Sequence, residues 1–232
     1  MSRTLLISGA SRGIGRAIAE RALADGHRLS LGVRHPVDLE GSALATSSRV
    51  LVHPYEASDP ASANAWVEAS AARFSALDGV IHCAGIFSRA GLLFDAAETA
   101  EIDQVLQVNL MGPWWLTRAI WPHLVASGDG RVITLVSMSG RRVKGPLAAY
   151  PVSKFALLGL CQTMRNVGWP LGIRVTALCP GWVNTAMAAG VQSIPPGAMT
   201  QSEDLAVLVS TLLTLRKEAV PFELAVNCLL ES

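Results

Sequence analysis

The chain has 232 residues, of which 50% are hydrophobic and 16% are charged, so it has enough apolar material for one large α/β domain. Its formal net charge of +1 gives no reason to expect a nucleic acid or a membrane surface as a partner. The four cysteines are widely spaced and form no C-x-x-C pair, so we expect small core residues and no metal site.

Nothing in the sequence resembles a targeting or membrane-spanning segment. The N-terminus runs directly into a strand pattern, without a charged and then apolar signal region. No stretch of about 18 consecutive apolar residues occurs, so no transmembrane helix is expected. We therefore expect a cytoplasmic protein.

Short apolar runs alternate with longer helical patterns along the chain. In order, the patterns predict a strand at Thr4–Ser8, a helix at Ile14–Ala24, strands at Arg28–Val33 and Arg49–His53, a helix from Pro60 to about Ala76 with Asp59 as its cap, a strand at Gly79–Cys83, two helices within Ala97–Ala126, a strand at Arg131–Val136, a helix at Ala149–Gly168, a strand at Ile173–Leu178, a helix at Ser202–Leu215 and a strand at Phe222–Val226.

Alternation of this kind predicts an α/β fold. We expect a doubly wound Rossmann fold, in which a seven-stranded parallel sheet carries helices on both faces. No linker or internal repeat interrupts the pattern, so residues 1–232 are expected to form a single dinucleotide-binding and catalytic domain. The segment Thr185–Gln201 has no clear period, and it is either a mobile lid or a long connection.

Three glycines lie between the first strand and the first helix. Gly9 permits a tight turn, Gly13 lets a pyrophosphate approach the free N–H groups of the helix, and Gly15 allows close packing of helix and strand. The spacing differs from the G-x-G-x-x-G of the commonest dinucleotide fingerprint. An ordinary strand-to-helix turn is the alternative interpretation.

Tyr150 and Lys154 are four residues apart in a predicted helix, which places both side chains on one face. A tyrosine has a pKa of about 10, and a neighbouring ammonium lowers that pKa toward the working range of a proton donor. Ser137 ends the preceding strand and is placed to hydrogen-bond a substrate oxygen. The alternative is a half-buried tyrosine with an unrelated surface lysine.

Together these residues resemble the single-domain branch of the short-chain dehydrogenase/reductase family, over essentially the whole chain. The family's T-G-x-x-x-G-I-G motif matches Ser8–Gly15, with serine in place of threonine. The other matches are the tyrosine and lysine pair, the serine thirteen residues before the tyrosine, Asn109 in a helix, Pro180 and Gly181 after the sixth strand, and Thr185. The Cys179–Val183 stretch resembles carbonyl reductases in particular.

The resemblance implies a catalytic role for Asn109, Ser137, Tyr150 and Lys154. Tyr150 would protonate the carbonyl oxygen, Ser137 would hold that oxygen, and Lys154 would lower the tyrosine pKa and bind the nicotinamide ribose. Asn109 would support a water that links Lys154 to solvent. A substrate pocket is expected from Phe87, Ser139, Leu147, Trp182 and Met187, so we expect a hydrophobic aldehyde or ketone.

The same resemblance implies which residues contact the cofactor. The expected contacts are Gly9, Ser11, Arg12, Gly13, Ile14, Gly15, Arg34, Glu56, Ala57, Ala84, Gly85, Tyr150, Lys154, Pro180, Gly181, Val183 and Thr185. NADP is expected over NAD, because Arg34 stands just past the second strand, where an acidic residue would bind the ribose 2′-hydroxyl, and Arg12 in the glycine turn is placed to reach the same 2′-phosphate from the other side. Asp38 is the competing candidate for that hydroxyl.

Some residues depart from the family pattern. The family's Asn-Asn-Ala-Gly is replaced by His82-Cys83-Ala84-Gly85, and we expect no catalytic role for His82. Glu56 stands where the family has an aspartate near adenine. Pro151 follows the tyrosine directly: proline suits a first helical turn, but it is expected to bias Tyr150 away from the helical region and so to shift the phenol slightly.

Three further expectations complete the sequence-based hypothesis. The apolar helices around Trp114–Leu124 and Phe155–Leu160 predict a homodimer or homotetramer, as in relatives. The basic run of Arg141, Arg142 and Lys144 is either a solvated loop, which we favour, or an anion site suited to a 3-oxoacyl carrier thioester. The rival functions are reduction of such a thioester, a related reaction through a transient ketone, and a non-catalytic dinucleotide-binding sensor or scaffold.

Overall fold

The structure, a computed structural model, describes residues 2–230. Within them, seven parallel strands form one sheet in the order β3-β2-β1-β4-β5-β6-β7. The strands are β1 Thr4–Ser8, β2 Arg28–Val33, β3 Val50–Pro54, β4 Gly79–His82, β5 Arg131–Leu135, β6 Arg174–Pro180 and β7 Glu223–Val226. The predicted doubly wound fold is confirmed, and its strand order reverses between β1 and β4.

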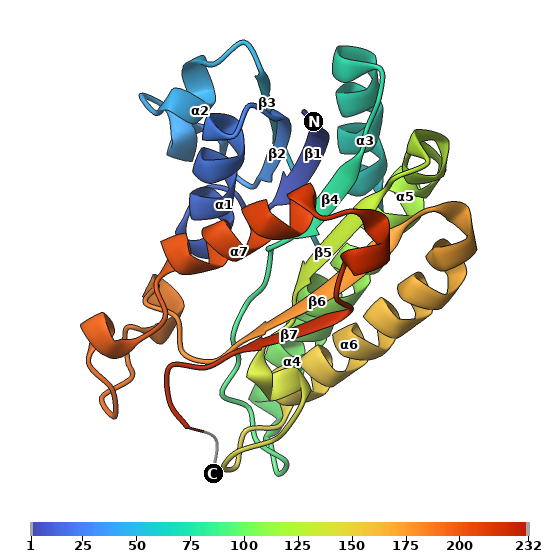
Figure 1. Ribbon diagram of the computed structural model, residues 1–232. Coiled ribbons are helices and arrows are strands. Elements are labelled where there is room, and N and C mark those ends of the chain that lie inside the picture. The colour runs from blue at the N-terminus through green and yellow to red at the C-terminus, as the bar shows by residue number, and fades with distance from the viewer. Residues whose placement is uncertain (1, 231–232) are drawn as a thin grey trace.

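Helices cover both faces of the sheet (Figure 1). Helices α1, α2 and α7 pack on one face, and α3, α5 and α6 pack on the other. Their bounds are α1 Gly13–Ala24, α2 Ala43–Thr46, α3 Pro60–Phe74, α4 Thr99–Leu106, α5 Gly112–Ser127, α6 Ala149–Gly168 and α7 Ser202–Thr214. The central strands are therefore buried on both sides, which explains their continuous apolar runs.

Strand β1 pairs with both β2 and β4, and its Leu6 lies opposite Ser30 of β2 and Val80 of β4. The indole of Trp66 donates a 2.8 Å hydrogen bond to the Ser30 hydroxyl, so a polar pair inside the core is satisfied. The same indole lies against Gly32, where an added Cβ would come within 2.6 Å of its ring. Helix α3 is fixed to the sheet by this contact.

The predicted region at 97–126 is one continuous helical stretch. Helix α4 passes into α5 through a π-helical segment at Gln107–Met111, without a break in the backbone. The short α2 and a 3₁₀ turn at Pro36–Leu39 were not predicted. Strand and helix ends otherwise agree with the prediction to within a few residues, as element ends commonly do.

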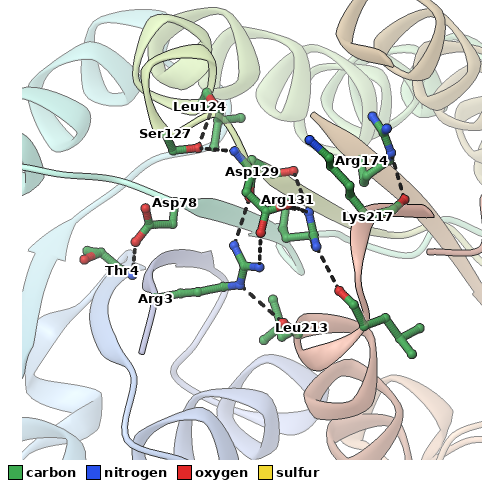
Figure 2. Close-up of polar contacts among 12 residues, drawn as sticks. Arg3, Thr4, Asp78, Leu124, Ser127, Asp129, Arg131, Arg174, Leu213 and Lys217 are labelled. Carbon is green, nitrogen blue, oxygen red and sulfur yellow. Dashed lines mark hydrogen bonds and ion pairs between the residues drawn. The ribbon is translucent and has the colours of Figure 1, made fainter. Parts of the chain in front are cut away.

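A charged network joins the sheet to α7 at the amino ends of the strands (Figure 2). The guanidinium groups of Arg3 and Arg131 both bind the Asp129 carboxylate. Arg131, only 2% exposed, also donates a 3.0 Å hydrogen bond to the Leu215 carbonyl. Arg3 donates to the Leu213 carbonyl at 3.3 Å. These contacts satisfy carbonyls at the end of α7 and leave the opposite, carboxyl edge of the sheet for the cleft described next.

Candidate active site

The turn after β1 brings backbone from three parts of the chain together. Gly9 has a φ of +68°, and an added Cβ would lie 2.8 Å from the Ala84 Cα. An added Cβ on Gly15 would lie 2.3 Å from the Gly9 carbonyl oxygen, so the absence of a side chain lets the start of the helix pack closely on the turn. Gly13, with a φ of +54°, faces the Thr185 side chain.

The start of α1 has the features of an anion site. Its cap residue, Arg12, makes no side-chain capping hydrogen bond, so it leaves the N–H groups of the first turn without a side-chain acceptor. The Ser8 hydroxyl instead accepts hydrogen bonds from the Cys83 and Ala84 N–H groups at 3.1 and 3.2 Å. Serine therefore ties the end of β1 to the segment after β4.

His82 is buried, and its Nε2 atom lies 3.0 Å from the hydroxyl oxygen of Thr117. Burial lowers the pKa of His82 to about 3, so its ring is neutral near pH 7. That His82 has no catalytic role stays a prediction. The side chain joins β4 to α5.

Tyr150, Ser137 and Lys154 meet at the carboxyl end of β5. Burial raises the pKa of the Tyr150 phenol, while a hydrogen bond with Ser137 lowers it. Ser137 has a φ of +139°, a strained conformation for a residue other than glycine. Its hydroxyl also accepts a 3.1 Å hydrogen bond from the Ser139 N–H, which fixes its direction.

Lys154 lies under the tyrosine ring, with Nζ 5.7 Å from the ring centre. Its ammonium donates a 3.0 Å hydrogen bond to the Leu135 carbonyl. Burial lowers the pKa of Lys154 to about 8. Burial, which raises the Tyr150 pKa, and the hydrogen bond with Ser137, which lowers it, are the causes found for its shift, and a lowering by Lys154 stays a prediction.

The expectation for Pro151 was wrong. Tyr150 lies inside α6, which begins at Ala149. Pro151 falls in the first turn, where a backbone N–H has no partner within the helix, so proline costs little there. The helix therefore starts one residue before the tyrosine and holds Tyr150 and Lys154 one turn apart.

Asn109 lies in the π-helical segment and is fully buried. Its side chain accepts from the Ile86 N–H at 2.8 Å and donates to the Ile86 carbonyl at 2.9 Å and to the Ser153 hydroxyl at 3.1 Å. Gly85 lies near both Asn109 and Lys154, because an added Cβ would be 3.3 Å from Oδ1 and 3.7 Å from Nζ. Asn109 thus fixes the segment after β4 against α6.

The residues expected near the adenosine lie in the segments that follow β1, β2 and β3. Arg12 and Arg34 are exposed, in the turns after β1 and β2. Asp38 is exposed in the 3₁₀ turn at Pro36–Leu39. The Glu56 carboxylate accepts hydrogen bonds from the N–H and the hydroxyl of Ser58, so it stabilises the turn in which both residues lie.

A cleft of about 800 Å³ opens above Tyr150. All five expected substrate residues line it: Phe87, Ser139, Leu147, Trp182 and Met187. Of the expected cofactor and catalytic residues it is lined by Ile14, Gly85, Ser137, Tyr150, Lys154, Pro180, Gly181, Val183 and Thr185. It is not lined by Gly9, Ser11, Arg12, Gly13, Gly15, Arg34, Glu56, Ala57, Ala84 or Asn109.

Sequence reasoning missed several residues of the cleft wall. Arg89, Gln192, Ser193 and the segment at 227–230 also line it. None of them belongs to a motif, and the segment at 227–230 reaches the cleft only because β7 lies beside β6. Within residues 2–230 no group of three or more His, Cys, Asp or Glu side chains could hold a metal ion.

No helix in the described part of the chain combines the length and apolar character that crossing a bilayer requires.

Residues 3–194 match the family model described as short chain dehydrogenase. An agropine synthesis reductase of Rhizobium rhizogenes is 37% identical over 231 residues, which are 100% of this chain and 54% of the relative. The chain thus spans about half the length of that relative.

Two solved structures resemble the chain throughout. A 3-ketoacyl-(acyl-carrier-protein) reductase from Brucella melitensis, complexed with NADH, has a TM-score of 0.88 and 25% identity, with 97% of each chain covered. An alcohol dehydrogenase from the archaeon Thermococcus sibiricus, complexed with 5-hydroxy-NADP, has a TM-score of 0.84 and 28% identity. That superposition covers 97% of this chain and 96% of the other.

Proposed function

The chain belongs to the short-chain dehydrogenase family of NAD(P)-dependent oxidoreductases, and we propose from this that it interconverts an aldehyde or ketone and its alcohol, with Tyr150 as the acid and base. The observation that carries the proposal is the convergence of Tyr150, Ser137 and Lys154 at one cleft. We further propose that residues 1–232 act as one dinucleotide-binding and catalytic domain.

Proton transfer is assigned to Tyr150. In the reducing direction its phenol donates a proton to the carbonyl oxygen, and burial keeps the phenol protonated near pH 7. Ser137 donates a hydrogen bond to the same oxygen, from a hydroxyl held in place by the Ser139 N–H. Lys154 places a positive charge under the ring, where it stabilises the phenolate left behind.

A nicotinamide dinucleotide fits the residues present. The α1 N-terminus offers N–H groups without a side-chain acceptor, and Gly13 at its start has no side chain to keep a pyrophosphate from the backbone. Lys154 would bind the ribose hydroxyls, and Val183 and Thr185 would hold the carboxamide. When bound, the nicotinamide supplies or accepts the hydride.

We propose NADP(H) as the preferred cofactor. Arg34 follows β2 directly, is exposed, and offers a forked set of donors to a 2′-phosphate. Arg12 approaches from the glycine turn, and Asp38 is the rival that would favour NAD. The two solved relatives carry one cofactor type each, so the family alone does not decide the choice.

The test compares kcat/KM for NADPH and NADH in wild type and in Arg34→Ala, with a panel of aldehydes and ketones. One charge-assisted hydrogen bond contributes about 1.5–3 kcal/mol, so Arg34→Ala should reduce the preference for NADPH by about tenfold or more. The NADH value should stay nearly constant. Wild type that prefers NADH, or a ratio unchanged by the substitution, contradicts the assignment.

A second candidate activity is reduction of a 3-oxoacyl thioester, which the likeness to the Brucella reductase favours. The same panel separates the two, because a thioester reductase should use an acetoacetyl thioester far better than simple ketones. A dinucleotide-binding protein without turnover would bind NADPH and reduce no member of the panel.

We also propose a homodimer or homotetramer. A groove of about 560 Å³ runs between α5 and α6 and is lined mainly by apolar side chains, including Trp114, Trp121 and Leu160. Members of the family are commonly oligomeric, and Trp114 is 51% exposed in the single chain. Association through this groove would remove those rings from water.

A further inference from the structure

An aromatic side chain from the segment after β4 packs against the proposed acid. The centre of the Phe87 ring lies 5.0 Å from the centre of the Tyr150 ring, and the two ring planes are inclined by 57°. That separation and inclination are those of a favourable aromatic pair. The same phenol has Lys154 near its ring and a hydrogen bond with Ser137. Phe87 therefore adds an apolar contact to these two polar ones.

Contacts on both sides of Phe87 fix the place of its ring. Asn109, which is fully buried, accepts a 2.8 Å hydrogen bond from the Ile86 N–H and donates a 2.9 Å hydrogen bond to the Ile86 carbonyl. One amide thus holds both backbone groups of the residue before Phe87. On the other side, the Arg89 guanidinium carbon lies 5.8 Å from the Phe87 ring centre. The ring is therefore held by the protein itself, without a substrate.

The buried amide of Asn109 also reaches the helix that carries the tyrosine. It donates a 3.1 Å hydrogen bond to the Ser153 hydroxyl, and that hydroxyl donates a 2.7 Å hydrogen bond to the Tyr150 carbonyl. A single side chain thus ties the segment before Phe87 to the first turn of α6. The two backbones are set by hydrogen bonds, and their two rings meet at the cleft.

This contact has two consequences for the phenol. A ring packed on one side limits the directions in which the phenol oxygen can point, and a displaced acid transfers its proton more slowly. The ring also keeps water away from that side of Tyr150. Because burial raises the pKa of the Tyr150 phenol, water admitted at the place of Phe87 should lower that pKa.

We propose that Phe87 is a positioning residue for Tyr150, whose ring directs the phenol toward Ser137 and excludes water from it. This inference rests on the proposed function, because it assigns a residue that acts through the proposed acid. Phe87 transfers no proton. Its role differs from that of a side chain that only contacts substrate, since its effect on the phenol should be present in the protein alone.

The phenol can be observed directly, because the chain has two tyrosines, Tyr55 and Tyr150. Protein labelled with 3-fluorotyrosine should give two fluorine resonances, which Tyr55→Phe assigns. Fluorine lowers the pKa of a phenol, so the ionisation of Tyr150 can be followed at a milder pH. Burial holds the pKa of Tyr55 well above its usual value, so the Tyr55 resonance is an internal reference for folding.

Phe87→Ala should change the Tyr150 resonance in the protein without substrate. Its chemical shift should move because the ring current of Phe87 is lost, and its titration midpoint should fall by at least about half a pH unit because water reaches the phenol. Phe87→Leu retains apolar bulk without a ring. It should restore at least about half of the change in midpoint, but not the chemical shift.

The ionisable groups around the phenol are the same in each variant. Within residues 2–230, those that line the cleft with Tyr150 are Cys83, Arg89, Arg142, Lys144, Lys154 and Cys228. Trp182→Ala is the matched control, because Trp182 is another aromatic residue of the cleft wall and, in the described part of the chain, has no ring contact with Tyr150. It should leave the chemical shift and the titration midpoint of Tyr150 unchanged.

Turnover is measured in parallel with NADPH and the carbonyl panel. Phe87→Ala should reduce kcat by at least about tenfold, with the Kd for NADPH within a few-fold of wild type. If its Tyr55 resonance shows that Phe87→Ala is unfolded, Phe87→Leu takes its place, and the chemical shift of Tyr150 should still move.

A Tyr150 resonance and midpoint that Phe87→Ala leaves unchanged overturn the proposal, and so does an equal change in Trp182→Ala. An unchanged kcat in Phe87→Ala overturns the positioning role as well. If wild type reduces no carbonyl while the resonance responds as expected, the contact of Phe87 with the phenol is supported and the proposed oxidoreductase activity is contradicted. The two failures are therefore distinct.

Discussion

Burial of the Lys154 charge destabilises the folded protein, although the proposed mechanism requires that charge. Its side chain is 5% exposed, and burial lowers its pKa to about 8 from 10.5. Keeping the charge in the folded protein at neutral pH costs on the order of 3 kcal/mol, because each pKa unit corresponds to about 1.4 kcal/mol. The cost is fully present below pH 8 and disappears as the pH approaches 10.5, where the unfolded lysine also loses its proton.

We therefore predict that Lys154→Met raises the melting temperature at pH 7 by about 2–4 °C while it removes most of the activity. The lost hydrogen bond to the Leu135 carbonyl offsets part of the gain. The difference from wild type should close at pH 10. Calorimetry at both pH values checks this, with the exposed Lys217→Met as control. A lower melting temperature at pH 7 would contradict the prediction.

At the scale of residues, the sequence identified those groups whose spacing along the chain predicts a chemical role. The four-residue separation of Tyr150 and Lys154 requires only a helix to bring them together. The pKa of the tyrosine could not be predicted, because it depends on burial and on a hydrogen bond from Ser137. Arg89 could not be recognised either, since its place in the cleft depends on a loop that no motif describes.

At the scale of elements, the turn after β1 tolerates no side chain at Gly15. An added Cβ would lie 2.3 Å from the Gly9 carbonyl oxygen, and backbone cannot yield as a flexible side chain does. We predict that Gly15→Ala moves the start of α1, lowers the melting temperature by at least about 3 °C and weakens NADPH binding about tenfold or more.

Fluorescence titration with NADPH and thermal denaturation test this prediction. Gly197→Ala is the matched control, because an added Cβ there meets nothing within 4 Å. That variant should bind NADPH like wild type. Normal binding by Gly15→Ala would show that the turn adapts and that its close contact has no role in the site.

Most elements were predictable because their residue patterns are strong. Central strands such as Leu5–Ile7 in β1 are buried on both faces and appear as continuous apolar runs. The four-residue α2 is too short to show a helical period. The π-helical segment around Asn109 could not be predicted from the sequence either, since one extra residue in a helical turn hardly changes the pattern of apolar residues.

At the scale of the whole molecule, the exposed groove between α5 and α6 predicts self-association. Trp114→Glu would place a charge in an apolar contact, so we expect it to lower the mass in solution to that of a monomer at micromolar protein. Light scattering after size-exclusion chromatography measures this. Val37→Glu is the control, because Val37 is exposed in the 3₁₀ turn at Pro36–Leu39 and does not line the groove, so this variant should leave the mass unaltered. Monomeric wild type would refute the prediction.

The overall topology followed from the order of elements, whereas the identity of the substrate did not. Alternation of strands and helices admits few arrangements because crossovers are right-handed, and the observed sheet is the expected one. The substrate end of the cleft is instead built from the loops after β4, β5 and β6 and from the segment after β7. Loops of this kind vary within one fold, so a fold assignment cannot define their ligand.

The central claim is hydride transfer to a carbonyl carbon with the proton from Tyr150. NADPH deuterated at the transferring position of C4 would be incubated with a carbonyl substrate from the panel, and the product would be examined by mass spectrometry. Wild type should place one deuterium on the former carbonyl carbon. Tyr150→Phe should do so at least about 10³-fold more slowly, with the Kd for NADPH within a few-fold of wild type. A product without deuterium, or a Tyr150→Phe rate within a few-fold of wild type, would contradict the mechanism.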